Sequence, residues 1–131
     1  MAGSLKELLV WRRAIELAIS VYRLTAQFPD AERFGLTNEM RRAAVSVSSN
    51  IAEGAGRATL GEFLQFVGIA RGSNFELESQ FVIARGLDFG KLAEMEEAEK
   101  LSDEVGRLLS LLGKSLRTKA GERKKPKNLT T

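Results

Sequence analysis

The stretch that decides the fold is residues 35–57, GLTNEMRRAAVSVSSNIAEGAGR. Apolar residues recur in it at intervals of three or four positions, which places them on one face of an α-helix. These residues are Leu36, Met40, Ala43, Val47 and Ile51. A second stripe carries only small side chains, Ala44, Ser48 and Ala52. Because small side chains let a neighbouring helix approach closely, we predict a packed helix that ends at Gly54 and Gly56.

Three further segments have helical periodicity, and they predict helices over about 4–27, 60–85 and 92–116. Ser4 and Thr59 each precede a glutamate by three positions, the capping-box pattern that marks a helix start. Short connections make consecutive helices antiparallel. The expected fold is all-α: an antiparallel up-down-up-down four-helix bundle over residues 1–117. A disordered basic C-terminal tail is expected over residues 118–131.

The first helix carries more apolar surface than a bundle core needs. One stripe is Leu8, Trp11, Ile15, Ala18, Tyr22 and Thr25, and the neighbouring one is Val10, Ala14, Leu17, Val21, Leu24 and Phe28. A bundle helix buries a stripe about 100° wide, so part of this surface should stay exposed. Exposed apolar patches on soluble proteins usually mark interfaces. We therefore predict an interface between copies of the chain that includes Val10, Leu17, Val21 and Leu24.

The composition excludes most catalytic chemistry. The 131 residues include no histidine and no cysteine, so the usual general base, the thiolate nucleophile and the commonest metal ligands are missing. The serines at 46, 48 and 49 have no activating base in their helix. The glycine-rich segment 54–61 follows a helix instead of a strand, which argues against a nucleotide-binding loop. We predict a protein that is not an enzyme and needs no cofactor or metal.

Composition also predicts the compartment. Hydrophobic residues make up 44% of the chain and charged residues 28%, which is ordinary for a soluble domain. The first residues lack the basic-then-apolar order of a signal peptide. No apolar run approaches the roughly 18 residues that a membrane span needs. We predict a cytoplasmic protein with no membrane partner.

Positive charge is distributed unevenly along the chain. Residues 118–131 carry five basic side chains and one acidic one, a net +4, so residues 1–117 sum to −1 within the total of +3. Arginine in particular suits phosphate, because its planar guanidinium donates two parallel hydrogen bonds. The candidate nucleic-acid-binding residues are Arg12, Arg13, Arg23, Arg41, Arg42, Arg57, Lys124, Lys125 and Lys127. The alternative is a solubilising surface in which such arginines pair with neighbouring carboxylates, for example Glu16.

The segment 41–57, RRAAVSVSSNIAEGAGR, resembles the signature of the bacterial four helix bundle protein family. Members are known as proteins encoded in intervening sequences of the 23S ribosomal RNA gene, and the accessory protein of diversity-generating retroelements is a relative. The similarity continues in LLVWRRAIELAISVYRLTAQFP (8–29) and EFLQFVGIARGSNFELESQFVIARGL (62–87). It spans roughly residues 5–117.

The resemblance implies the same four-helix fold and a homopentamer, because the family is similar to proteins that form one. It leads to two hypotheses. In the first, a non-enzymatic homo-oligomer binds structured RNA through phosphates and shape. In the second, the bundle is a protein-protein adaptor or scaffold, for instance for a reverse transcriptase, without nucleic-acid contact. Lysines that the family often carries after the turn are replaced here by Leu60 and Gly61, which lowers the basic density of the bundle.

Overall fold

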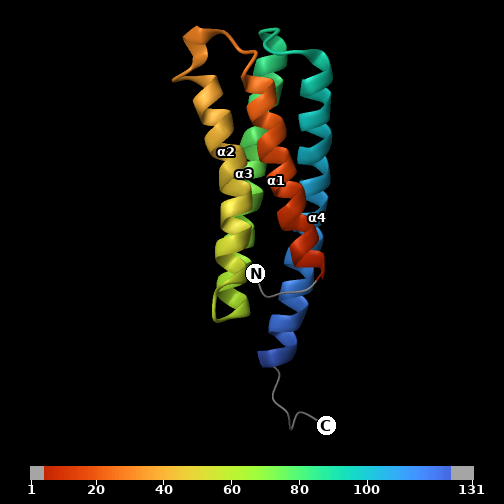
Figure 1. Cartoon of the computed structure of the whole chain (residues 1–131). Coiled ribbons are helices and arrows are strands. Elements are labelled where there is room, and N and C mark those ends of the chain that lie inside the picture. Colours follow the sequence, from red (N-terminus) through yellow and green to blue (C-terminus); the bar gives the residue numbers. More distant parts are fainter. Residues whose placement is uncertain (1–4, 125–131) are drawn as a thin grey trace.

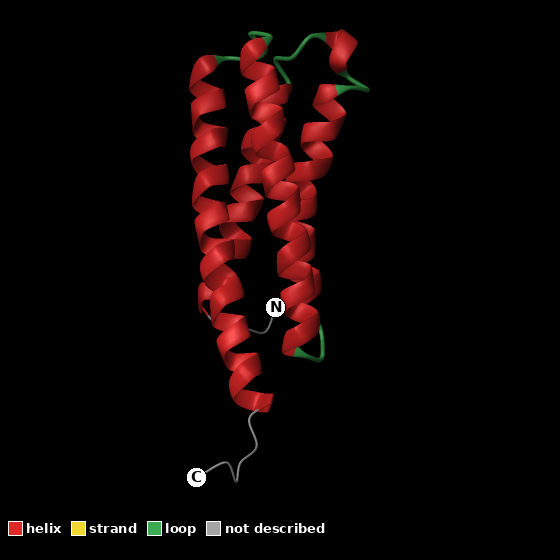
Figure 2. Cartoon of the chain, turned by 180° about the vertical axis from the view of Figure 1, so that it is seen from behind, coloured by secondary structure: helices red, strands yellow, loops and turns green. Residues whose placement is uncertain are grey.

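A computed structural model describes residues 5–124, and in that range the chain forms an all-α bundle (Figure 1). The helices are α1 (Leu5–Thr25), α2 (Leu36–Ala55), α3 (Leu60–Gly86) and α4 (Leu92–Lys124), with a short 3-10 helix η1 (Asp30–Glu32) after α1. Each long helix packs against two others: α1 and α3 both contact α2 and α4. Figure 2, the view from behind, shows only helices and loops in the described part. The predicted antiparallel four-helix bundle is confirmed.

The helix α4 is longer than the sequence pattern predicts. It ends at Lys124, and its last turns extend beyond the lower end of the other helices (Figure 1). The predicted boundary of the disordered tail at residue 118 is therefore wrong for residues 118–124. Lysine, arginine, glutamate and alanine make up most of this stretch, and their high helix propensity favours the helix. Residues 125–131 lie outside the described residues, as do Ser4 and its predicted cap.

The core corrects the predicted interface on the first helix. Val10, Leu17, Val21 and Leu24 are each at most 1% exposed, so they face the core and not another copy of the chain. The neighbouring stripe is more exposed: Trp11, Ile15 and Ala18 are only partly buried and Tyr22 is 45% exposed, although Thr25 is buried. The physical reason is the chemistry of the two stripes. The buried stripe is entirely aliphatic up to Phe28, whereas the other carries aromatic rings with polar ends, which tolerate water.

The helix α2 buries the predicted apolar face, but its small stripe is only partly buried. Ala44 and Ser48 are buried, whereas Ala52 is exposed. Residues four apart drift by about 40° around a helix, so this stripe rotates out of the contact by its third member. Near the end of α2, a Cβ atom added at Gly54 would lie 2.7 Å from the Phe66 Cβ. The close approach of α2 and α3 at that point requires a glycine.

A buried polar pair joins α3 to α4. The Asn74 Nδ2 donates to the Ser102 backbone carbonyl at 3.0 Å, and the Ser102 Oγ donates to the Asn74 Oδ1 at 2.9 Å. Because both side chains are almost fully buried, the pair is satisfied only when these two residues lie opposite each other.

At the start of α3, the predicted cap is confirmed: the Thr59 Oγ1 accepts a hydrogen bond from the Glu62 backbone N–H at 3.1 Å.

Candidate functional site

The predicted nucleic-acid-binding arginines fall into two groups, and the first group is already paired. The Arg13 guanidinium on α1 donates to Glu16 at 2.8 Å and to Glu104 on α4 at 2.7 Å. The hydrogen bond that Arg13 donates to Glu16, followed by the one that it donates to Glu104, raises the pKa of Arg13 above its usual value. Two carboxylates therefore balance the Arg13 charge within the bundle, and the hydrogen bond to Glu104 links α1 to α4.

Arg57, in the turn between α2 and α3, is paired as well. Its Nη2 lies 2.9 Å from Glu53 Oε1, and Glu62 approaches to 4.0 Å on the other side. The guanidinium also lies over the Phe66 ring, 4.7 Å from the ring centre. These contacts hold the side chain over the turn. As with Arg13, a phosphate would have to compete with carboxylates for this guanidinium.

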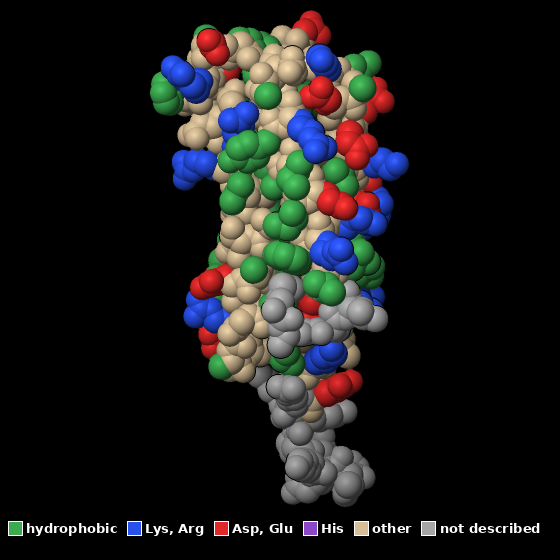
Figure 3. Space-filling view, viewed as in Figure 1, with side chains coloured by type: hydrophobic (Ala, Val, Ile, Leu, Met, Phe, Trp, Pro, Cys, Tyr) green, Lys and Arg blue, Asp and Glu red, His purple; other side chains and the backbone are tan. Residues whose placement is uncertain are grey.

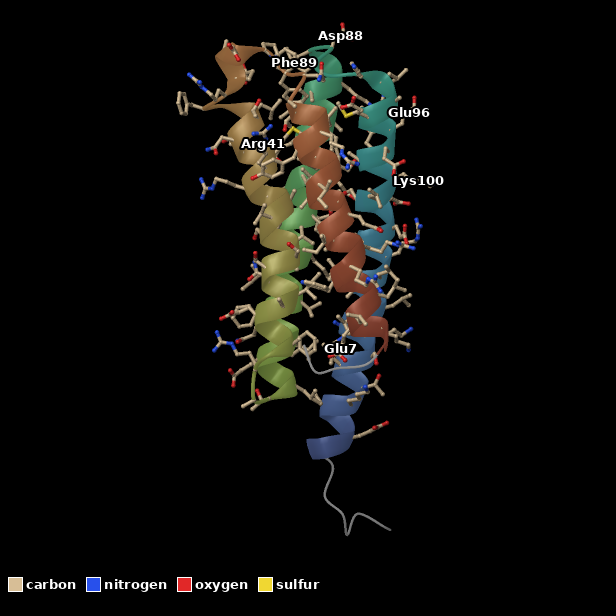
Figure 4. The ribbon with its side chains drawn as sticks, viewed as in Figure 1. Glu7, Arg41, Asp88, Phe89, Glu96 and Lys100 are labelled. Atoms are coloured by element: carbon tan, nitrogen blue, oxygen red, sulfur yellow. The ribbon has the colours of Figure 1, made fainter. Side chains whose placement is uncertain are left out.

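Arg41 is oriented by neutral partners instead. Its Nε donates to the Thr25 Oγ1 at 2.8 Å, and Nη2 donates to the Tyr22 carbonyl at 3.4 Å. The guanidinium lies 4.5 Å from the centre of the Tyr22 ring. Figure 4 shows Arg41 projecting from α2 near the upper end of the bundle, where α1 ends. A cation is favourable there because the last carbonyls of α1 carry partial negative charge. The Arg41 charge is thus fixed in place without being neutralised by a carboxylate.

Arg12, Arg23 and Arg42 are exposed and unpaired. None of them forms a hydrogen bond, an ion pair or a ring contact with another side chain that the structure describes. Arg12 and Arg23 are eleven positions apart, about three turns, so both lie on the outward face of α1. Among the tail candidates, Lys124 is the last residue of α4, and Lys125 and Lys127 lie outside the described residues.

An apolar groove of about 540 Å³ runs between α1 and α2. Its lining is Ile15, Ala18, Ile19, Tyr22, Arg23, Ala26, Val45 and Ser48. Figure 3 shows the corresponding band of hydrophobic side chains down the front of the molecule, with basic side chains beside its upper part. Arg23 is the one charged residue of this lining. Because carboxylates are absent from the lining, the groove suits an apolar ligand with an acidic margin.

The groove on the other side of α1, between α1 and α4, has a different character. It measures about 690 Å³, and its charged lining residues are Arg13, Glu16, Arg23, Glu94, Glu97, Lys100 and Glu104. Four carboxylates outnumber three basic groups, so a polyanion would be repelled there. The acidic first half of α4 therefore makes the α1–α4 groove less favourable for a phosphate than the α1–α2 groove.

The outward face of α3 is a second apolar surface, which the sequence reasoning missed. Ile69, Phe75, Val82 and Ile83 are all more than half exposed. Gly68 and Gly72 lie on the same face, and the structure places nothing within 4 Å of a Cβ atom at either position. Close packing against a neighbouring helix therefore does not compensate for the low helix propensity of these two glycines. The seven-residue spacing of Phe75 and Val82, opposite the buried face, is the sequence signal for this surface.

Residues 5–124 contain neither a cluster of metal-ligating side chains nor a membrane-spanning helix. No group of three or more potential ligand residues in this range is arranged to hold a metal ion. None of the helices described there is long and apolar enough to cross a membrane. The described residues present three candidate surfaces: the unpaired arginines, the α1–α2 groove and the outward face of α3.

Comparison with known proteins agrees with this architecture. The family model for the 23S rRNA-intervening sequence protein matches residues 6–111. No curated protein matches the chain. Among solved structures, a protein of unknown function from the S23 ribosomal protein family of Bacteroides thetaiotaomicron VPI-5482 is similar. It shares 20% sequence identity with a TM-score of 0.77, over 84% of this chain and 99% of that chain. At this identity the likeness concerns the fold, whereas the family match covers most of the chain: the protein belongs to the 23S rRNA-intervening sequence protein family.

Proposed function

We propose that this protein is a non-enzymatic, homo-oligomeric bundle that binds structured RNA in the cytoplasm through arginines on α1 and α2. The observation that carries the proposal is the unpaired state of Arg12, Arg23 and Arg42. Other arginines of the bundle, such as Arg13 and Arg57, are paired with carboxylates at hydrogen-bond distance. Leaving three guanidiniums exposed without a partner in the described chain is what a phosphate-binding surface requires.

The chemistry of the arginines fits recognition of double-stranded RNA better than recognition of a particular base sequence. Guanidinium forks bind phosphate oxygens with two parallel hydrogen bonds and carry no sequence information. A-form RNA is recognised mostly by its shape, its phosphates and its 2′-hydroxyl groups. Arg41, held over Tyr22 and not neutralised by a carboxylate, adds a positive charge on the α1–α2 side of the bundle.

Assembly would supply the charge that one subunit lacks. Residues 1–117 sum to −1, so a single bundle has no basic field of its own. A ring, for which the resemblance implies five subunits, repeats the same arginines around one assembly and raises the avidity for a long RNA. The family name, which refers to 23S ribosomal RNA, supports RNA as the ligand class.

Fluorescence anisotropy with a labelled structured fragment of ribosomal RNA tests the proposal. The variant Arg12→Ala/Arg23→Ala/Arg42→Ala should bind at least about tenfold more weakly, because charge-assisted contacts are lost. The matched control removes the same charge from exposed positions at the start of α4 and along it, Lys91→Ala/Lys100→Ala/Lys114→Ala. The control should retain most of the affinity. Equal losses in both variants, or no loss in either, would contradict the assignment of the arginines.

The second candidate function is a protein adaptor, for instance for a reverse transcriptase, and the α1–α2 groove favours it. An amphipathic helix binds in such a groove through its apolar face, and acidic residues at its edges would meet Arg23 and Arg41. The test is a binding measurement with purified reverse transcriptase, free of RNA. If this candidate holds, Val45→Asp in the groove should abolish binding. The triple arginine variant, which changes the outer faces of the bundle, should weaken binding only partly.

A further inference from the structure

The α1–α2 groove contains an aromatic ring that is partly open to solvent. Tyr22 lines the groove and is 45% exposed. Arg41, which projects from α2 (Figure 4), places its guanidinium 4.5 Å from the centre of this ring. The Thr25 hydroxyl holds that guanidinium by a hydrogen bond of 2.8 Å. Aromatic rings and guanidinium planes are the protein surfaces on which unpaired RNA bases stack, so the groove offers a stacking surface.

The rest of the groove is apolar and presents few hydrogen-bonding groups. Its walls are the aliphatic side chains of Ile15, Ala18, Ile19, Ala26 and Val45. The Ser48 hydroxyl, which also lines it, donates its proton to the Val45 carbonyl at 3.0 Å. The volume of about 540 Å³ is within the range of sites that hold small molecules. Such a groove suits a base of any identity, because every base has a flat π-face.

The margins of the groove are positive, and carboxylates of the same two helices lie elsewhere. Arg23 comes from α1 and Arg41 from α2, so each helix contributes one guanidinium. Glu16 is bound to an arginine on the α1–α4 side, Glu39 lines a pocket between α2 and α3, and Glu53 pairs with the arginine of the next turn. Arg23 also borders the acidic α1–α4 groove, but it forms no ion pair with any side chain that the structure describes.

We propose that the α1–α2 groove binds one unpaired nucleotide of the RNA, with the base against Tyr22 and the flanking phosphates at Arg23 and Arg41. This inference rests on the proposed function: an RNA whose phosphate is bound by Arg23 already lies at the edge of the groove. A nucleotide has a phosphate on each side of its base, which matches an apolar floor between two guanidiniums. Because paired bases are stacked inside a duplex, the ligand is a structured RNA with a bulged nucleotide beside a helical segment.

Three RNA hairpins that differ at one position test the inference by fluorescence anisotropy with the full-length protein. The first is fully paired, the second carries one bulged adenosine in its stem, and the third carries an abasic nucleotide in place of that adenosine. The protein should bind the bulged RNA about tenfold more tightly than the other two, because stacking of one base on an aromatic side chain contributes about that much. The abasic RNA keeps the phosphates of the bulge and therefore isolates the base.

Substitutions at the groove connect the preference for the bulged RNA to Tyr22. Tyr22→Leu removes the ring and should bind all three RNAs equally, whereas Tyr22→Phe keeps the ring and should retain the preference. Ile19→Asp places a negative charge in the groove and should abolish the preference as well. A thermal melt checks that each variant is folded, as expected for exposed positions.

Two exposed rings outside the groove lining provide matched controls. The Phe75 ring lies 5.9 Å from the Arg71 guanidinium, in a pocket that also contains two carboxylates. The Phe34 ring lies 5.0 Å from the Arg33 guanidinium, in the turn before α2. Phe75→Leu and Phe34→Leu should therefore keep the tenfold preference for the bulged RNA.

The possible failures can be told apart. A wild-type protein that binds the bulged and the paired RNA equally tightly overturns the nucleotide site and leaves the proposed RNA-binding surface standing. An abasic bulge bound as tightly as the adenosine bulge, or a preference that persists in Tyr22→Leu, also overturns the site, because the base would then not lie on the ring. If Ile19→Asp loses binding to purified reverse transcriptase and keeps the RNA preference, the groove belongs to a protein partner and the nucleotide site is refuted. A protein that binds none of the three RNAs refutes the proposed function and this inference with it.

Discussion

Replacing Gly54 by alanine should destabilise the bundle, although alanine is the better helix former. A Cβ atom at this position would lie 2.7 Å from the Phe66 Cβ and 2.9 Å from the Phe63 Cδ1. The Phe66 Cβ cannot rotate away, because it is bonded directly to the backbone of α3. The two helices must therefore separate locally, and overpacking of this kind costs about 1–3 kcal/mol, here near the upper end.

The gain in helix propensity offsets only part of that cost. Alanine in place of glycine gains about 1 kcal/mol in a helix interior and less near a helix end, where Gly54 lies. The net loss of unfolding free energy should be about 1–2 kcal/mol. Gly68 is the matched control, because nothing lies within 4 Å of its added Cβ. Gly68→Ala should stabilise the protein by about 0.5–1 kcal/mol, so the same substitution has opposite signs at the two sites.

Urea unfolding followed by circular dichroism measures both effects. All variants are compared at the same protein concentration, so that any association of subunits contributes equally to the measured free energies. The melting temperature should fall by several degrees for Gly54→Ala and rise for Gly68→Ala. If Gly54→Ala is as stable as its parent, α2 and α3 do not approach as closely as the distances indicate, and the packing account of the turn is wrong.

Three further predictions follow from the packing and from the tail. Asn74→Ala should cost about 1–3 kcal/mol of unfolding free energy by breaking the buried pair, and adding Ser102→Ala should cost much less than it does alone; a double-mutant cycle measures this coupling. Ala44→Leu should cost about 1–3 kcal/mol in a thermal melt, whereas Ala52→Leu, on the exposed end of the same stripe, should change stability by less than about 0.5 kcal/mol; equal effects would refute the helix rotation. Truncation after Arg117 should leave the stability nearly unchanged, because residues 118–122 bury no large side chain. The same truncation should reduce the salt dependence of RNA binding by up to about 0.9 log units per lost duplex contact. An unchanged slope would show that the tail does not contact the RNA.

The fold was predictable from the sequence because its signals are local. The periodicity of residues 36–51 and the cap at Thr59 each report on a single helix, and short connections then leave few topologies. The end of α4 was missed for the converse reason: residues 118–122 are helical but bury no large apolar side chain, so they carry no periodic signal. Helix propensity alone was the clue there.

The surfaces were harder to predict, because they depend on which side of a helix meets its neighbours. Both stripes of α1 are apolar, and periodicity cannot choose between Leu17 and Ile15 for the core. The aromatic members of one stripe, Trp11 and Tyr22, were the available signal that it faces outward. Which arginines are paired with carboxylates depends on contacts between residues that are still further apart in the sequence. Arg13 pairs with Glu104, 91 positions away, and this partnership has no local trace in the sequence.

The central claim is that the unpaired arginines of α1 and α2 contact RNA phosphates. The salt dependence of binding tests it most directly, because each neutralised phosphate contributes about 0.9 to the slope of log K against log salt on a duplex. For Arg12→Ala/Arg23→Ala/Arg42→Ala the slope should fall by up to about 2.7 per bound subunit relative to the wild type, and the triple lysine control on α4 should keep the wild-type slope. A triple arginine variant with the wild-type slope, or a wild-type protein whose RNA binding does not respond to salt, would contradict the account.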